Sequence, residues 1–242
     1  MRRILLSSLL LACLLSAQFT AAPGTAAAGP YRDLDNDAGQ WQMWLDPDGR
    51  QANWELAGVG NPSLDGRAVK IGVDGGDPYT GLHAYRSLPA MPAARTFSMT
   101  TKFRYAANAH PIQAIEFSLS KWQNNKRWEW AIQWENVQDG TAEQGAPQSW
   151  RLWDGKGWKN TGAVQQLAPD RWHTLTLNGE IDGRGQVRYT SIVCNGVTTR
   201  LGQTYAPTSG TYEAVTVAVQ LDGDEGMTPQ QLYLDGVSLD AR

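Results

Sequence analysis

Residues 114–135 comprise two neighbouring segments that alternate apolar and polar side chains with a period of two residues. This is the period of a β-strand that buries one face, whereas an amphipathic helix repeats every three to four residues. The Asn124-Asn125 pair between the segments is a turn signal, so the sequence predicts a β-hairpin. The predicted register pairs Glu116 with Gln133, Ser118 with Ala131 and Ser120 with Glu129.

The two faces of this hairpin differ in chemistry. One face is apolar and is expected to pack in a core, and it carries Ile115, Phe117, Leu119, Trp128, Trp130, Ile132 and Trp134. The other face carries Glu116, Ser118, Ser120, Trp122, Glu129, Gln133 and Glu135. Carboxylates, an amide, hydroxyls and an indole on one surface offer many hydrogen-bonding groups to a ligand.

The rest of the chain repeats the same pattern. Short alternating runs separated by Gly, Asp, Asn and Pro recur, and after residue 28 no helical period extends over three turns. Eleven strands are predicted, over residues 68–73, 82–86, 96–105, 112–120, 128–135, 149–153, 172–177, 186–194, 198–201, 214–222 and 232–239. We therefore predict an all-β fold, a two-sheet antiparallel jelly-roll sandwich formed by a single domain over residues 29–242.

The first 28 residues have the pattern of a signal peptide. Arg2-Arg3 precedes an apolar run over residues 4–15, and Ala26-Ala27-Ala28 offers a cleavage site. That run is too short to span a bilayer as a helix, and no later apolar run is longer. We expect an exported protein, extracellular or periplasmic, with no membrane span. Lipidation of Cys13 is the alternative that Leu10-Leu11-Ala12-Cys13 leaves open.

Charge argues against a nucleic-acid-binding protein, and cysteine content argues against a protein stabilised by an internal disulfide. The formal net charge is −3, and removal of residues 1–28 would delete two arginines and no acids, which lowers the charge to −5. No cluster of lysine and arginine forms the basic surface that a nucleic acid needs. Cys194 is the only cysteine after residue 28, so the sequence excludes an internal disulfide in the processed chain.

Two further strand sequences resemble a known group of folds. Residues 172–179 read WHTLTLNG and residues 232–239 read LYLDGVSL. They resemble strands of the concanavalin A-like lectin/glucanase superfamily, and residues 116–139 are similar to uncharacterised exported bacterial proteins of that sandwich type. The resemblance implies two curved sheets whose concave face binds a glycan chain, in lectins, glycoside hydrolases or polysaccharide lyases. The chain has neither the Glu-x-Asp-x-x-Glu pattern of laminarinase-like hydrolases nor the Gln-Ile-His strand of alginate lyase-like enzymes, so neither active site is carried over.

Tryptophan and polar side chains single out the candidates for glycan binding. Eight of the eleven tryptophans lie between residues 122 and 172, and indole rings stack well on the apolar C–H faces of sugars. Trp128, Trp130 and Trp134 fit the core better. The candidates for binding are Trp122, Trp153, Trp158, Ser118, Glu129, Gln133, Gln220 and Asp222. The leading hypothesis is a sandwich that binds a polysaccharide or oligosaccharide along its concave sheet.

A glycan-cleaving enzyme is the first alternative, because binding and cleavage use the same kinds of side chain. Glu116 and Glu135 would be diagonal neighbours with Cβ atoms roughly 7–8 Å apart, a spacing suited to the two catalytic carboxyl groups of a glycoside hydrolase. Two solvated glutamates would give the same pattern. A lyase would instead use Lys102, Arg104, Arg127 or Arg151 to neutralise a uronate, with Tyr105 or His110 as base. A protein–protein adhesion module is the second alternative.

Calcium is the metal that the acidic loops favour, although no cofactor is required for the binding hypothesis. Asp33 lies near the expected mature N-terminus and Asp235 in the last predicted strand, and in similar sandwich modules a structural calcium joins these regions. Turn formation by Asp beside Gly explains such residues equally well. His83, His110 and His173 lack the spacing of metal ligands, which argues against zinc.

Overall fold

The computed structural model describes residues 29–107, 112–136 and 148–242. The predicted signal peptide, with Cys13, and also His110 lie outside these residues. The elements in chain order are η1 (Leu34–Asn36), η2 (Ala38–Gln40), β1 (Trp41–Asp46), β2 (Asn53–Val59), β3 (Ala68–Asp74), β4 (Gly81–Leu88), β5 (Thr96–Tyr105), β6 (Ala114–Gln123), β7 (Lys126–Glu135), β8 (Ser149–Trp153), β9 (Trp158–Val164), β10 (His173–Ile181), β11 (Val187–Cys194), β12 (Val197–Arg200), β13 (Thr204–Tyr205), β14 (Thr208–Ser209), β15 (Ala214–Asp222) and β16 (Gln230–Ala241). In this part of the chain no helix has the length and apolar character of a membrane span.

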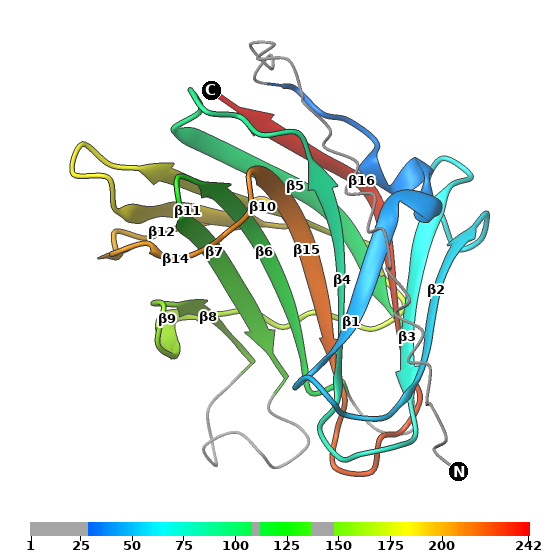
Figure 1. Cartoon of the computed structure of the whole chain (residues 1–242). Helices are drawn as coiled ribbons and strands as arrows, with labels where there is room; N and C mark the ends of the chain where they lie inside the picture. The colour runs from blue at the N-terminus through cyan, green and yellow to red at the C-terminus, as the bar shows by residue number, and fades with distance from the viewer. Residues whose placement is uncertain (1–28, 108–111, 137–147) are drawn as a thin grey trace, which may run out of the picture.

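The strands form two eight-stranded sheets (Figure 1). The front sheet has the order β1-β4-β15-β6-β7-β8-β9, and β14 pairs with β7. The back sheet has the order β12-β11-β10-β5-β16-β3-β2, and β13 pairs with β11. Strand pairs in both sheets are antiparallel, which confirms the predicted jelly-roll sandwich. Figure 1 shows β15, from the end of the chain, between β4 and β6 in the front sheet.

The core lies between the two sheets and is rich in aromatic rings. Trp130 and Trp134 are fully buried and Trp128 is 9% exposed, which confirms that these three belong to the core. Each indole N–H donates to a backbone carbonyl: Trp128 to Gly185 at 2.8 Å, Trp130 to Arg188 at 3.0 Å and Trp134 to Gln165 at 3.0 Å. These bonds avoid the penalty of a buried donor without an acceptor.

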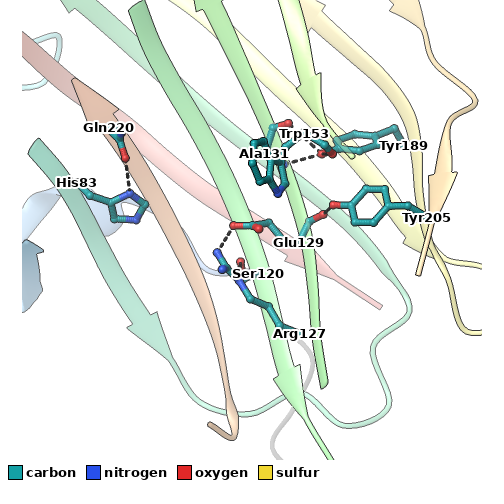
Figure 2. Close-up of polar contacts among 9 residues, drawn as sticks. All are labelled: His83, Ser120, Arg127, Glu129, Ala131, Trp153, Tyr189, Tyr205 and Gln220. Carbon is teal, nitrogen blue, oxygen red and sulfur yellow. Dashed lines mark hydrogen bonds and ion pairs between the residues drawn. The ribbon is translucent and has the colours of Figure 1, made fainter. Parts of the chain in front are cut away.

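Tyr189 of β11 links the two sheets through its hydroxyl (Figure 2). The oxygen accepts a hydrogen bond from the backbone N–H of Ala131 at 2.8 Å and lies 2.9 Å from the carbonyl oxygens of Ala131 and Trp153. The pairing of β7 with β8 ends at Ile132 and Leu152, so the hydroxyl sits where these two strands separate. Burial raises the pKa of Tyr189 well above its ordinary value, and the hydroxyl keeps its proton.

Each of the eleven predicted strands overlaps an observed one, and the described chain has five more: β1, β2, β9, β13 and β14. Strands β1, β2 and β9 are at the edges of the sheets, where a strand has one neighbour instead of two. Most residues of β2 and β9 are exposed or half-buried, which weakens the alternation that identifies a strand. Strands β13 and β14 have two residues each and are too short for such a signal.

Candidate functional site

The central hairpin, β6 and β7, has the predicted register. Glu116 pairs with Gln133, Ser118 with Ala131 and Ser120 with Glu129. The polar side chains therefore point to the outer face of the front sheet, away from the core. The neighbouring strands extend one row of side chains across this face, composed of Trp44, His83, Gln220, Glu116, Gln133 and Arg151.

Gln133 is the centre of a hydrogen-bond network on this face. It is only 4% exposed, and its Nε2 donates to Glu116 Oε1 at 2.8 Å and to Asp222 Oδ2 at 3.2 Å. Its Oε1 accepts from Arg151 Nε at 2.9 Å and also from Arg151 Nη2. All the hydrogen-bonding capacity of one buried amide is thus directed to charged side chains from three other strands, which fixes their positions.

Gln220 continues the network towards β1 and β4. Its Nε2 donates to Asp222 Oδ1 at 2.8 Å and to Asp46 Oδ2 at 3.3 Å, while its Oε1 lies 3.0 Å from His83 Nδ1 (Figure 2). An amide oxygen only accepts, so His83 Nδ1 carries a proton. Burial lowers the pKa of His83, against the opposing effect of the Gln220 hydrogen bond. The neutral ring therefore has its unprotonated nitrogen at Nε2.

Glu116 and Asp222 form a coupled pair of carboxyl groups. Burial raises the pKa of Glu116 well above its ordinary value, and the nearby Asp222 charge raises it further. Burial also raises the pKa of Asp222, to about 6, against the lowering effect of the Gln220 and Gln133 hydrogen bonds. Two adjacent carboxyl groups do not ionise independently, so the pair binds a proton more tightly than two separate, solvated carboxyl groups would.

Glu135 occupies a different environment from Glu116. Its Oε1 forms an ion pair with Arg151 Nη1 at 3.0 Å, and Arg151 also binds Gln133. Gln133 and Arg151 thus connect the two glutamates that were predicted as a catalytic pair. The structure adds a carboxyl partner for Glu116 that the sequence analysis did not pair with it, namely Asp222.

A groove of about 450 Å³ runs along the outer face beside this network. Its volume lies in the range of small-molecule sites. Small side chains lie at its centre, namely Ser87, Ser118, Ser120, Ala214, Thr216 and Ala218. Larger groups complete the lining: Gln42, Trp44, His83, Tyr85, Trp122, Arg127 and Tyr212.

Trp122 is a wall of this groove and is only half-exposed. The Arg127 guanidinium carbon lies 4.7 Å from the centre of its ring, and Tyr212 meets the ring edge-on with 5.3 Å between centroids. Part of the Trp122 ring is therefore covered by these two side chains. The more exposed rings of the groove are Trp44, which is 43% exposed, and Tyr212, which is 65% exposed.

Glu129 and its neighbours form a second set of contacts, near the turn of the hairpin (Figure 2). Arg127 Nη2 pairs with the Glu129 carboxylate, and Arg127 Nε donates to Ser120 Oγ at 3.3 Å. Tyr205 donates its hydroxyl hydrogen to the backbone carbonyl of Glu129. Burial raises the pKa of Glu129, and the Arg127 charge opposes that rise.

The remaining glycan-binding candidates lie apart from the groove. Trp153 and Trp158 face each other across β8 and β9 with centroids 5.5 Å apart, at the edge of the front sheet, and neither lines the groove. Trp44, Tyr85 and Tyr212 line the groove without having been predicted from the sequence, and so does His83, for which no role was predicted. Alternation in residues 41–46 and 81–88 is the signal for three of them, whereas no pattern marks Tyr212, which precedes β15.

The lyase residues predicted on β5 are wrongly placed for this groove. Tyr105 is buried, its hydroxyl donates to the Leu167 carbonyl at 2.6 Å, and burial raises its pKa to about 12. Lys102 and Arg104 alternate with buried residues of the same strand and face the outside of the back sheet. The front sheet therefore lies between Tyr105 and the groove, and both sheets lie between the groove and Lys102 or Arg104.

The predicted calcium ligands do not meet in the way expected. Asp33 is exposed, whereas Asp235 is buried and accepts hydrogen bonds from Ser63 Oγ at 2.9 Å and Leu64 N at 2.6 Å. The N-terminal residue that reaches β16 is Asp35, which accepts from Val237 N at 2.6 Å. Asp35 Oδ2 and Asn36 Oδ1 are buried without a hydrogen-bond partner, which fits a cation ligand. Among the described residues, however, no three His, Cys, Asp or Glu side chains are grouped as metal ligands, and calcium stays a prediction.

Comparisons with known proteins identify the fold. No protein-family profile and no curated protein matches the chain. The basic winged bean lectin with Tn-antigen aligns over 88% of this chain and 98% of that chain, with a TM-score of 0.53 and 9% identity. An alginate lyase in complex with an alginate trisaccharide aligns over 84% of this chain and 98% of that chain, with a TM-score of 0.46 and 10% identity. A structure of carbohydrate-binding modules of the β-sandwich superfamily aligns over 85% of this chain, with a TM-score of 0.43 and 12% identity. Our chain spans 59% of the length of that chain. The lectin match shows a concanavalin A-like fold, as the sequence predicts.

Proposed function

We propose that this protein is an exported glycan-binding protein and that the sugar chain lies in the groove on the outer face of the front sheet. The observation that carries the proposal is the lining of the groove. Aromatic rings of Trp44, Tyr85, Trp122 and Tyr212 surround small side chains, and hydrogen-bonding groups adjoin them. A sugar ring needs an apolar surface for its C–H face and acceptors or donors for its hydroxyl groups, and this lining offers both.

The network beside the groove supplies the polar half of that recognition. His83 lines the groove, and the Gln220 bond leaves its Nε2 as an acceptor for a sugar hydroxyl. Gln133 and Gln220 are buried and fully engaged, so they position the neighbouring groups instead of binding sugar directly. Sites held by such supporting bonds lose little conformational entropy when a ligand binds.

Affinity electrophoresis in gels that contain soluble polysaccharides, followed by calorimetry on the oligosaccharide of the best one, tests the proposal. Trp44→Ala is expected to raise the Kd about tenfold, which corresponds to a loss of about 1.4 kcal/mol of binding free energy. Trp54→Ala is the matched control, because Trp54 is 52% exposed but belongs to β2 of the back sheet. No binding to any polysaccharide, or equal effects of the two substitutions, would contradict the proposed site.

Hydrolysis of the bound glycan is a second candidate, favoured by the state of Glu116. Burial raises the pKa of Glu116 well above its ordinary value, which is the direction that a general acid requires. Asp222 and Glu135 are the carboxyl groups near it. A reducing-end assay on the polysaccharides that bind would detect cleavage. Glu116→Gln keeps the shape of the side chain and removes its transferable proton, so a variant with full turnover would exclude this role.

A further inference from the structure

The charged groups on the outer face of the front sheet limit the kind of glycan that can bind there. On the strands of this sheet, two cationic side chains point outward, Arg127 and Arg151, as their pairing with Trp122 and Gln133 shows. Five carboxyl groups share the face: Asp46, Glu116, Glu129, Glu135 and Asp222. The face is therefore acidic.

Both arginines are already neutralised by partners on the same face. Arg127 pairs with Glu129, donates to Ser120 and stacks over Trp122. Arg151 pairs with Glu135 and donates twice to the Gln133 amide. A ligand anion would have to compete with a covalently anchored carboxylate for either guanidinium, at an entropic disadvantage.

Within the groove lining, no side chain other than Arg127 is a lysine or arginine. His83 is the remaining basic side chain in the groove lining, and burial lowers its pKa. The two internal segments outside the description, residues 108–111 and 137–147, contain no lysine or arginine in their sequence. A carboxylate or sulfate on each sugar would lie near the carboxyl groups beside the groove, while the one arginine of the lining, Arg127, is already paired with Glu129.

We infer that the groove selects an uncharged glycan and rejects polyuronates, a conclusion that rests on the proposed function and specifies its ligand. Hydroxyl groups of a neutral sugar can hydrogen-bond with His83 Nε2 and with the serine and threonine hydroxyls of the lining, and the C–H faces of the sugar can lie against Trp44 and Tyr85. The carboxyl groups beside the groove would repel a uronate but not a neutral chain. This also argues against uronate-cleaving chemistry on this face.

The test compares neutral and anionic polymers in the same gels. Wild-type protein is run at pH 7.5 and 150 mM salt against galactomannan, xyloglucan, laminarin and hydroxyethyl cellulose, and against alginate and polygalacturonate. We expect retardation by at least one neutral polymer and at least tenfold weaker retardation by both polyuronates. Stronger binding of a polyuronate that Trp44→Ala abolishes would overturn the inference and leave the proposed function intact. Failure of every polymer to bind, or binding insensitive to Trp44→Ala, would instead refute the proposed function.

Two substitutions test the charge argument directly. Glu135→Gln releases Arg151, and Glu129→Gln releases Arg127, so each is expected to raise the ratio of alginate to neutral-glycan affinity at least threefold. Glu55→Gln is the matched control, since it releases Lys70 from a 2.6 Å ion pair on the back sheet and is expected to leave the ratio unchanged. An unchanged ratio in both released-arginine variants, with thermal unfolding showing that they are folded, would overturn the inference.

Discussion

Asp222 is expected to make the folded protein more stable as the pH falls from 7.5 to 4.5. Its pKa in the folded protein is about 6, against an ordinary value of 3.8, so the folded state binds this proton more tightly than the unfolded state. A raised pKa contributes stability that is complete below the unfolded value and is lost as the pH rises through the folded value. Other carboxylates that form ion pairs act in the opposite direction, so the effect must be isolated by substitution.

The size of the effect follows from the two pKa values. At pH 7.5 both states have released the proton, and Asp222 adds almost nothing. At pH 4.5 the folded state is almost fully protonated at Asp222 while the unfolded state is mostly ionised, which corresponds to a gain of about 2 kcal/mol. Asp222→Asn removes this gain, and it also removes the negative charge that raises the pKa of Glu116. Both changes reduce the stability that the variant gains when the pH falls.

Urea unfolding at pH 7.5 and 4.5 measures the effect as a double difference. The change in unfolding free energy between the two pH values should be more favourable in wild type than in Asp222→Asn by about 2 kcal/mol. Any pH-independent cost of the substitution cancels. Asp48→Asn, on an exposed turn, is the control and should match wild type. A double difference below about 0.5 kcal/mol, or one of opposite sign, would refute the assignment of Asp222 as a desolvated, coupled carboxyl group.

Three further substitutions or conditions test the fold around the site. Tyr189→Phe should lower the unfolding free energy by about 1–3 kcal/mol, because it leaves backbone groups of Ala131 and Trp153 buried without their partner; urea unfolding that shows no loss would contradict this. Gly179→Ala should cost about 1–3 kcal/mol, since an added Cβ would overlap the Trp130 indole, and near-ultraviolet circular dichroism should report the displaced ring. Calcium at 1 mM should raise the Tm above that in chelator by binding the buried, unpartnered Asp35 Oδ2, and Asp35→Asn should remove the difference; equal Tm values would exclude the site.

The hairpin could be predicted because its information is local. Its two strands are joined by a turn of Asn124 and Asn125, both of which have positive φ, and each strand buries one face. A slip of one residue would move Trp130 and Trp134 out of the core, so the apolar pattern together with the two-residue turn determines the register. That register also places Gln133 opposite Glu116, which the structure confirms.

The groove could not be predicted because it depends on strand order. Asp222 lies beside Glu116 only because β15 pairs with β6, and the chain runs through eight other strands between these two. Trp44 and His83 meet at 5.0 Å between centroids because β1 pairs with β4, and β1 is absent from the predicted strands. Alternation indicates which face a side chain occupies, but it does not indicate which strands are neighbours.

Tyr189 of the back sheet binds the backbone of the central hairpin from its core face. Its hydroxyl takes up the backbone groups of Ala131 and Trp153 at the point where β8 separates from β7. Two residues further along β7, the strands are still paired, and Gln133 lies opposite Arg151. A side chain of the back sheet thus satisfies the backbone groups that the end of the β7–β8 pairing would leave buried and unpaired, two residues from the position where Gln133 binds Arg151.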